Sequence, residues 1–192
     1  MKKLLAVILL VVVLPCTGYA LPVTINSPGT GASTSYTFDG SNTSGFAGWI
    51  NTSLGPLFCA ELGQTVTPGQ TYNYTPVTPT GVYISAAWLL NEFGASADTG
   101  NEAAGLQAAI WEVIFGDRFT LIDGAVGTFG TISYWQDYYL DNLPSTPTLP
   151  PGYVILANAN NQDLLITRVP EPMTMLLLGL GLVGLAGLRR KE

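Results

Sequence analysis

One cysteine and one glutamine are the residues of this chain whose chemistry and surroundings allow a covalent bond between them. The chain has two cysteines and no histidine. Cys16 lies in an apolar N-terminal segment, and removal of that segment leaves Cys59 as a single thiol that cannot form an internal disulfide. Gln107 lies on the otherwise apolar face of an expected helix, where an unpaired amide costs about 1–3 kcal/mol. Attack of the Cys59 thiol on the Gln107 carbonyl would expel ammonia and form a thioester.

The residues that flank this pair resemble a known arrangement. Phe58 precedes Cys59, and the stretch from Gln107 to Trp111 reads Gln-Ala-Ala-Ile-Trp. Residues 58–115 resemble the thioester domains of bacterial surface adhesins, which carry an aromatic-Cys motif and a Gln-x-Ala-Ile-Trp motif. The resemblance implies a covalent adhesin with an internal Cys59–Gln107 thioester, shielded from water by Phe58 and Trp111, that captures amine-bearing targets on a surface or in a matrix.

Two other interpretations of the cysteine stay open. In the first, Cys59 is a free thiol in the core of a non-covalent structural or glycan-binding matrix protein, where Trp135, Tyr138 and Tyr139 stack on sugars. In the second, Cys59 is the nucleophile of a hydrolase, which the absence of a histidine base disfavours. We expect no enzyme activity beyond self-catalysed thioester formation, no cofactor, and no metal site, because the scattered aspartates lack calcium-loop spacing.

The C-terminal residues 169–192 combine three features in order. Val169, Pro170, Glu171 and Pro172 precede an apolar run over residues 173–188, and a basic tail over 189–192 follows with Arg189, Arg190 and Lys191. The prolines keep the backbone extended, the apolar run predicts a transmembrane helix, and the cations predict a cytoplasmic stop. This order resembles the PEP-CTERM sorting signal of Gram-negative bacteria. The resemblance implies an inner-membrane intermediate, processing by an exosortase, and delivery to the cell surface or extracellular matrix.

The N-terminal residues 1–20 predict a secretory signal peptide. Two lysines follow Met1, residues 4–14 are uniformly apolar, and Ala20 ends a stretch with small residues at the cleavage positions. We therefore expect signal peptidase to cut after Ala20 and the mature protein to be exported.

Residues 21–168 form the expected thioester-domain-like core, and this core is strongly acidic. It holds eleven of the 13 acidic residues but only two basic ones, Arg118 and Arg168, and therefore carries a net charge of −9. Binding to nucleic acid is disfavoured by this charge, whereas amine-rich cationic targets are favoured. The core has no lysine, so it presents no side-chain amine of its own to attack a thioester.

The order of the expected elements predicts an α+β fold, a β-sandwich or barrel with an inserted helical unit, flanked by the signal peptide and the transmembrane sorting helix. Helices are expected at 82–93, at 102–116 with Asn101 as the N-cap, and at 133–140. Strands are expected at 21–49, 57–62, 70–74, 153–157 and 164–167, with a loop at 76–81.

Replacement of Pro170-Glu171-Pro172 by alanines is expected to leave an uncut precursor that stays in the membrane. The alanines restore two amide donors and helix propensity at the site that a processing enzyme must grip in an extended form. Immunoblotting of membrane and released fractions measures the outcome. Normal processing and release of this variant would show that the tripeptide is not a sorting signal.

Overall fold

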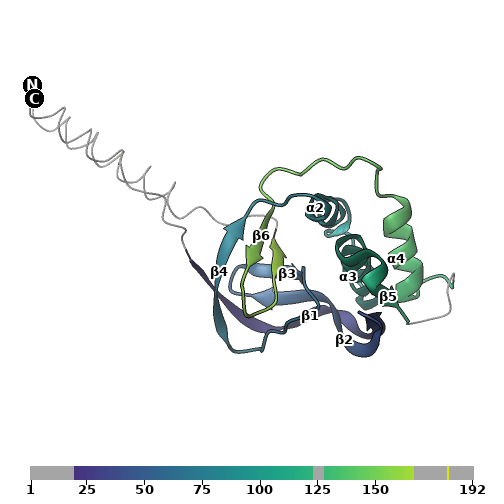
Figure 1. The fold of residues 1–192 in the computed structure, drawn as a ribbon, viewed down its shortest axis with the longest axis horizontal. Helices are drawn as coiled ribbons and strands as arrows, with labels where there is room; N and C mark the ends of the chain where they lie inside the picture. Colours follow the sequence, from purple (N-terminus) through teal and green to yellow (C-terminus); the bar gives the residue numbers. More distant parts are fainter. Residues whose placement is uncertain (1–19, 123–127, 167–180, 182–192) are drawn as a thin grey trace, which may run out of the picture.

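Seven strands and three α-helices make up the part of the chain that this computed structural model describes, residues 20–122, 128–166 and 181 (Figure 1). The strands are β1 (Leu21–Phe38), β2 (Ser41–Thr52), β3 (Gly55–Cys59), β4 (Thr71–Val77), β5 (Phe119–Leu121), β6 (Val154–Ala157) and β7 (Leu164–Ile166). The helices are α2 (Val82–Phe93), α3 (Gly100–Phe115) and α4 (Ile132–Asp141), with a short 3-10 turn η1 (Gly116–Arg118) after α3.

Six of the strands form a closed antiparallel barrel. The order β2-β3-β7-β6-β4-β1 returns to its start because β1 also pairs with β2. The first strand makes this closure possible by its length, since its beginning pairs with β4 and the remainder with β2. Its last residues, Tyr36–Phe38, also pair with β5. Alternate residues of β1, including Leu21, Val23 and Ile25, point inward and are buried.

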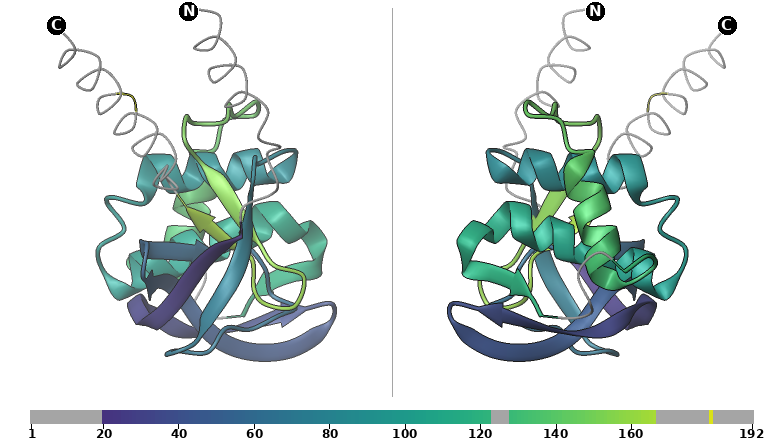
Figure 2. Two further views of the ribbon diagram at one scale, coloured as in Figure 1. Left: turned by 90° about the vertical axis from the view of Figure 1, so that its left-hand side faces the viewer. Right: turned by 90° about the vertical axis from the view of Figure 1, so that its right-hand side faces the viewer.

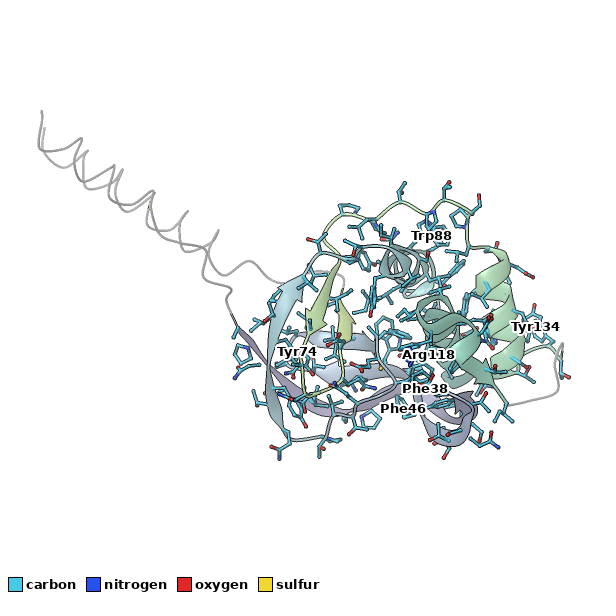
Figure 3. The ribbon with its side chains drawn as sticks, in the orientation of Figure 1. Phe38, Phe46, Tyr74, Trp88, Arg118 and Tyr134 are labelled. Carbon is cyan, nitrogen blue, oxygen red and sulfur yellow. The ribbon has the colours of Figure 1, made fainter. Side chains whose placement is uncertain are left out.

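The β1–β2 hairpin bends where its two strands approach each other most closely. The register shifts between Pro28 and Gly31, and Gly48 opposite has a φ of 134°. A Cβ atom on Gly48 would lie 2.4 Å from the Thr30 carbonyl oxygen, so only glycine fits there. At the other end of the hairpin, the exposed Arg118 pairs with Asp39 and covers the Phe38 ring (Figure 3).

The helices lie together on one side of the barrel (Figures 1 and 2). The N-cap of helix α3 lies two residues before the expected one. Thr99, not Asn101, caps it: the Thr99 hydroxyl accepts from the Glu102 N–H, and the Glu102 carboxylate accepts from the Thr99 N–H at 2.9 Å. This reciprocal capping box satisfies two amide donors at once, which a cap by Asn101 alone would not do.

Helix α3 is the central element of the fold, and its middle segment is buried on all sides. Every residue from Ala103 to Trp111 is buried, and the helix contacts β1, β2, α2 and α4. Six of these nine residues are alanine, glycine or glutamine, and the five alanines and glycines are small enough to admit neighbouring elements closely. The polar Gln107 lies in the middle of this segment, with no exposed surface.

Gly105 is the point at which α4 reaches α3. A Cβ atom there would lie 2.5 Å from the Trp135 Cβ and 3.0 Å from both the Gln136 nitrogen and the Ile132 carbonyl oxygen. Two of these three atoms belong to the α4 backbone, which cannot move away without displacing the whole helix. Absence of a side chain at this position therefore sets the spacing of the two helices.

The α+β fold expected from the sequence is confirmed, and the helical unit lies between β4 and β6 as expected. Three details differ. The expected short strands over 21–49 are two long strands, β4 runs through Pro76 into the expected loop, and β5 inside the helical unit was not expected. The signal peptide and the 173–188 helix lie outside the described residues, Ala20 and Gly181 excepted. Within the described ranges, no helix is both long and apolar enough to cross a membrane.

Substitution Gly105→Ala is expected to destabilise the protein. Helix propensity alone would favour alanine by up to about 1 kcal/mol, but overpacking against the α4 backbone costs roughly 1–3 kcal/mol. The melting temperature should therefore fall by a few degrees in a thermal unfolding experiment. A melting temperature equal to or above that of the unsubstituted protein would contradict the close approach of α3 and α4.

Candidate functional site

The two residues singled out from the sequence meet in the interior, where the end of β3 faces the middle of α3. Gln107 accepts a hydrogen bond from the Cys59 N–H through Oε1 at 3.0 Å. Its Nε2 donates a second bond to the Cys59 carbonyl oxygen at 2.8 Å. Cys59 is 3% exposed and Gln107 is fully buried. The side-chain amide of the helix is thus docked on the main chain of the cysteine.

These two hydrogen bonds change one argument made from the sequence. A buried amide must find partners or incur a cost, and Gln107 finds them, because the Cys59 main chain supplies both an acceptor and a donor. The amide therefore incurs no penalty that a covalent bond would have to relieve. What the contact provides instead is position, since it holds the amide group of Gln107 directly against the residue that carries the thiol.

The Cys59 thiol is held in its neutral form. Burial is the main cause and raises the pKa of the thiol to about 12. The S–H donates to the Glu61 carbonyl oxygen, and the Glu61 N–H lies 3.3 Å from the sulfur. The Trp111 indole favours the thiolate, although its N–H completes no hydrogen bond of ordinary geometry among the described residues. We take Trp111 as a weak electrostatic neighbour rather than a bonded partner.

Two carboxyl groups near the thiol also favour its neutral, protonated form. Charges on Glu61 and Asp163 both raise the pKa of Cys59. Their own pKa values are raised as well, mainly by burial, and for Glu61 also by the neighbouring Asp163. The main chain links the same segments, since the Ala60 N–H donates to the Asp163 carbonyl oxygen at 2.8 Å. The thiol therefore has acidic neighbours, and no cation accompanies them in these contacts.

The two residues expected to shield the bond occupy different positions. Trp111 lies in the same buried cluster as Cys59, and its ring packs against Tyr36 and Phe119. Phe58 points to the opposite face of β3, into the cluster beneath the helices, where its ring lies 4.2 Å from that of Trp49. Trp111 is the aromatic neighbour of the thiol, whereas Phe58 anchors β3 to the helical unit.

Sequence reasoning missed the polar residues that complete the surroundings of the thiol. Tyr36 from β1 and Tyr74 from β4 both have pKa values raised by burial and, to a smaller extent, by Cys59. Gln162 donates to the Glu61 carbonyl oxygen that also accepts from the thiol. These residues come from strands and turns far apart in the sequence, so no local motif marked them. Within the described ranges, no cluster of three metal-ligating residues is present.

The remaining sites expected from the sequence fall at the ends of the chain. Ala20 is described and exposed, but the segment before it lies outside the described residues. The tripeptide with Val169, and the cations at 189–191, also lie outside them.

Comparison with known proteins bears on these terminal segments. The PEP-CTERM protein-sorting motif matches residues 168–191. This match indicates an exported protein that an exosortase processes and that passes through the membrane to the cell surface. Neither the curated proteins nor the solved structures contain a significant match to the chain.

The raised pKa of Cys59 predicts slow alkylation of the free thiol in the folded protein. At pH 8, iodoacetamide should react with native protein more than about a hundredfold more slowly than with urea-unfolded protein, because the thiolate is scarce and the sulfur is buried. Mass spectrometry of timed samples measures both rates. Similar rates would contradict this environment. Burial alone produces the protection, so protection does not distinguish a thiol from a thioester.

Proposed function

We propose that this exported protein is a single-use covalent adhesin, in which Cys59 and Gln107 close an internal thioester that captures an amine. The observation that carries the proposal is the docking of the Gln107 amide on the Cys59 main chain by two buried hydrogen bonds. The resemblance of the flanking motifs to thioester domains supports it. The two residues were selected from the sequence by chemical type, and the fold brings them into contact.

The proposed closure is an acyl transfer within the protein. The Cys59 sulfur attacks the Gln107 side-chain carbonyl carbon, an S–C bond forms, and the C–N bond breaks. The thiol proton goes to the departing nitrogen, which leaves as ammonia. The Cys59 N–H, 3.0 Å from Oε1, is placed to stabilise the negative charge that develops on this oxygen. With a thiol pKa of about 12, this closure is a slow maturation step and not a turnover reaction.

In the capture reaction, a target amine replaces the Cys59 sulfur on the Gln107 carbonyl carbon. A target amine attacks the same carbonyl carbon, an amide forms on the Gln107 side chain, and the sulfur takes up a proton and returns as the Cys59 thiol. The absence of histidine from the chain and of lysine from the core fits a protein that reacts once and does not consume its own thioester. The core charge of −9 favours encounter with cationic, amine-rich targets and disfavours nucleic acid.

The cellular setting of the proposal follows from the sorting motif. We place the protein first as an inner-membrane intermediate of a Gram-negative bacterium, anchored by its C-terminal helix, after signal peptidase has acted. Exosortase processing then delivers it to the cell surface or extracellular matrix. The match to the sorting motif at residues 168–191 supports this route.

One observation favours the alternative of a non-covalent structural or glycan-binding matrix protein. Both polar ends of the Gln107 side chain already have partners, so the pair is stable as a hydrogen-bonded contact without a covalent bond. Cys59 is then a buried free thiol in the core.

The intact mass of the purified protein is expected to lie about 17 Da below that of the unmodified chain, the mass of the ammonia expelled. Treatment with methylamine should add one methylamine at Gln107 and make the Cys59 thiol detectable after unfolding. Peptide mass spectrometry locates both changes.

The variants Cys59→Ala and Gln107→Ala should each show the full unmodified mass and no methylamine adduct. Gln136→Ala serves as the matched control, because Gln136 is another buried glutamine, bonded to Glu112 and not to Cys59. Its mass deficit should persist. A native protein with the full mass, measured in parallel with folded variants, would refute the thioester and leave the free-thiol alternative.

A further inference from the structure

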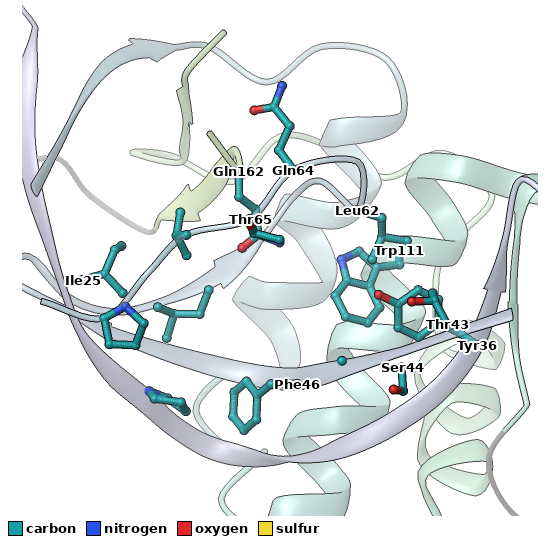
Figure 4. A pocket seen from close by; sticks show the side chains of 15 residues that line it. Ile25, Tyr36, Thr43, Ser44, Phe46, Leu62, Gln64, Thr65, Trp111 and Gln162 are labelled. Carbon is teal, nitrogen blue, oxygen red and sulfur yellow. The ribbon is translucent and has the colours of Figure 1, made fainter. Parts of the chain in front are cut away.

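A pocket next to the Cys59–Gln107 pair takes no part in the proposed capture. It has a volume of about 340 Å³, within the range of small-molecule sites, roughly 300–1,000 Å³. Strands β1 and β2 form one wall, the segment 62–68 forms the other, and Trp111 of α3 closes one end (Figure 4). In Figure 4 Tyr36 stands beside Trp111 at that end, Ile25 lies toward the other, and Phe46 lies below.

The pocket is neutral although the core around it is strongly acidic. None of its lining residues is aspartate, glutamate, lysine or arginine, whereas the core as a whole has a charge of −9. A charged ligand would enter without a counter-ion and would lose hydration without compensation. The lining therefore selects for an uncharged ligand.

The pocket also holds unused hydrogen-bonding capacity. Among the described residues, two buried side-chain polar atoms lack a partner, Gln64 Oε1 and Trp111 Nε1, and both residues line this pocket. Gln64 Nε2 is occupied by the Ala159 carbonyl oxygen, which leaves its Oε1 as a free acceptor. The Trp111 N–H, which interacts weakly with the Cys59 thiol, completes no ordinary hydrogen bond and retains donor capacity. Buried polar atoms are nearly always paired, so each of these two atoms has capacity for one further hydrogen bond to a group that enters the pocket.

We propose that this pocket binds a neutral hydroxylated ligand, a single uncharged sugar residue. A hydroxyl group both donates and accepts, so one ligand type can satisfy both the Gln64 acceptor and the Trp111 donor. The rings of Tyr36, Phe46 and Trp111 offer apolar surface to the C–H face of a sugar. At the opening, the exposed hydroxyl groups of Thr43 and Ser44 match a polyhydroxylated rim.

This binding is separate from the covalent capture. Cys59 and Gln107 do not line the pocket, and sugar binding is reversible and forms no covalent bond. The Cys59→Ala variant therefore loses the thioester but keeps the sugar site, so the two proposals can fail independently.

The test titrates the purified full-length protein with glucose, galactose, mannose and N-acetylglucosamine at millimolar concentrations, and follows binding by saturation-transfer NMR and calorimetry. Glucosamine and glucuronic acid are the charged counterparts. At least one neutral sugar should bind, and its charged counterparts should bind at least about tenfold more weakly, because the pocket has no counter-charge. Absence of binding by every neutral sugar, or equal binding of charged ones, would overturn the proposal.

Two variants locate the bound sugar. Ser44→Trp fills the opening and should abolish binding, whereas Ser41→Trp, at an exposed serine on the same strand outside the pocket, should not. Gln64→Leu removes the free acceptor and should weaken binding about tenfold. Circular dichroism verifies the fold of each variant, and Gln64→Leu decides the question if Ser44→Trp does not fold. Unchanged affinity in a folded Ser44→Trp or in Gln64→Leu would rule the pocket out.

Discussion

The contact between the Gln107 amide and the Cys59 main chain joins the two halves of this fold. The Gln107 side chain bridges α3 and β3, and each of its two hydrogen bonds satisfies a buried polar group of the Cys59 main chain. Loss of the amide would leave the Cys59 N–H and carbonyl oxygen unpaired, at about 1–3 kcal/mol each. The position of the central helix on the barrel and the chemistry open to Cys59 therefore depend on the same contact.

The fully buried middle of α3 holds the polar Gln107 side chain at that place. The small residues of α3 allow β1, β2, α2 and α4 to pack closely around it, and Gly105 lets the α4 backbone come within contact of its own. Trp111, one turn after Gln107, then fills the space between the thiol and the neighbouring pocket. Among the described residues, the hydrogen bonds of the Gln107 side chain both go to Cys59.

The sequence was sufficient for local features and for residue chemistry, and insufficient for long-range pairing. Helix α2 was predicted with its observed ends, because Gly81 and Gly94 mark them locally. The Cys59–Gln107 pair was chosen by chemical type. Thr99 was missed as the cap because the capping box needs the Glu102 side chain to fold back, and β5 was missed because its three residues become a strand only beside β1. The neighbours of the thiol, such as Tyr36 and Asp163, are far from Cys59 in the sequence. They come near it only when the strands pair to close the barrel.

The hydrogen bonds around Gln107 also indicate which nucleophile the proposed thioester would accept. Closure removes Nε2, so the Cys59 carbonyl oxygen loses its donor, while Oε1 keeps the Cys59 N–H. Attack by a primary amine restores an amide N–H at the vacated position and can return that bond. Attack by an alcohol supplies no N–H. Attack by water leaves a carboxyl group with no exposed surface, where burial disfavours its charged form. In the proposed reaction, an amine therefore leaves a neutral amide at position 107, whereas water leaves an ionisable group in a buried site.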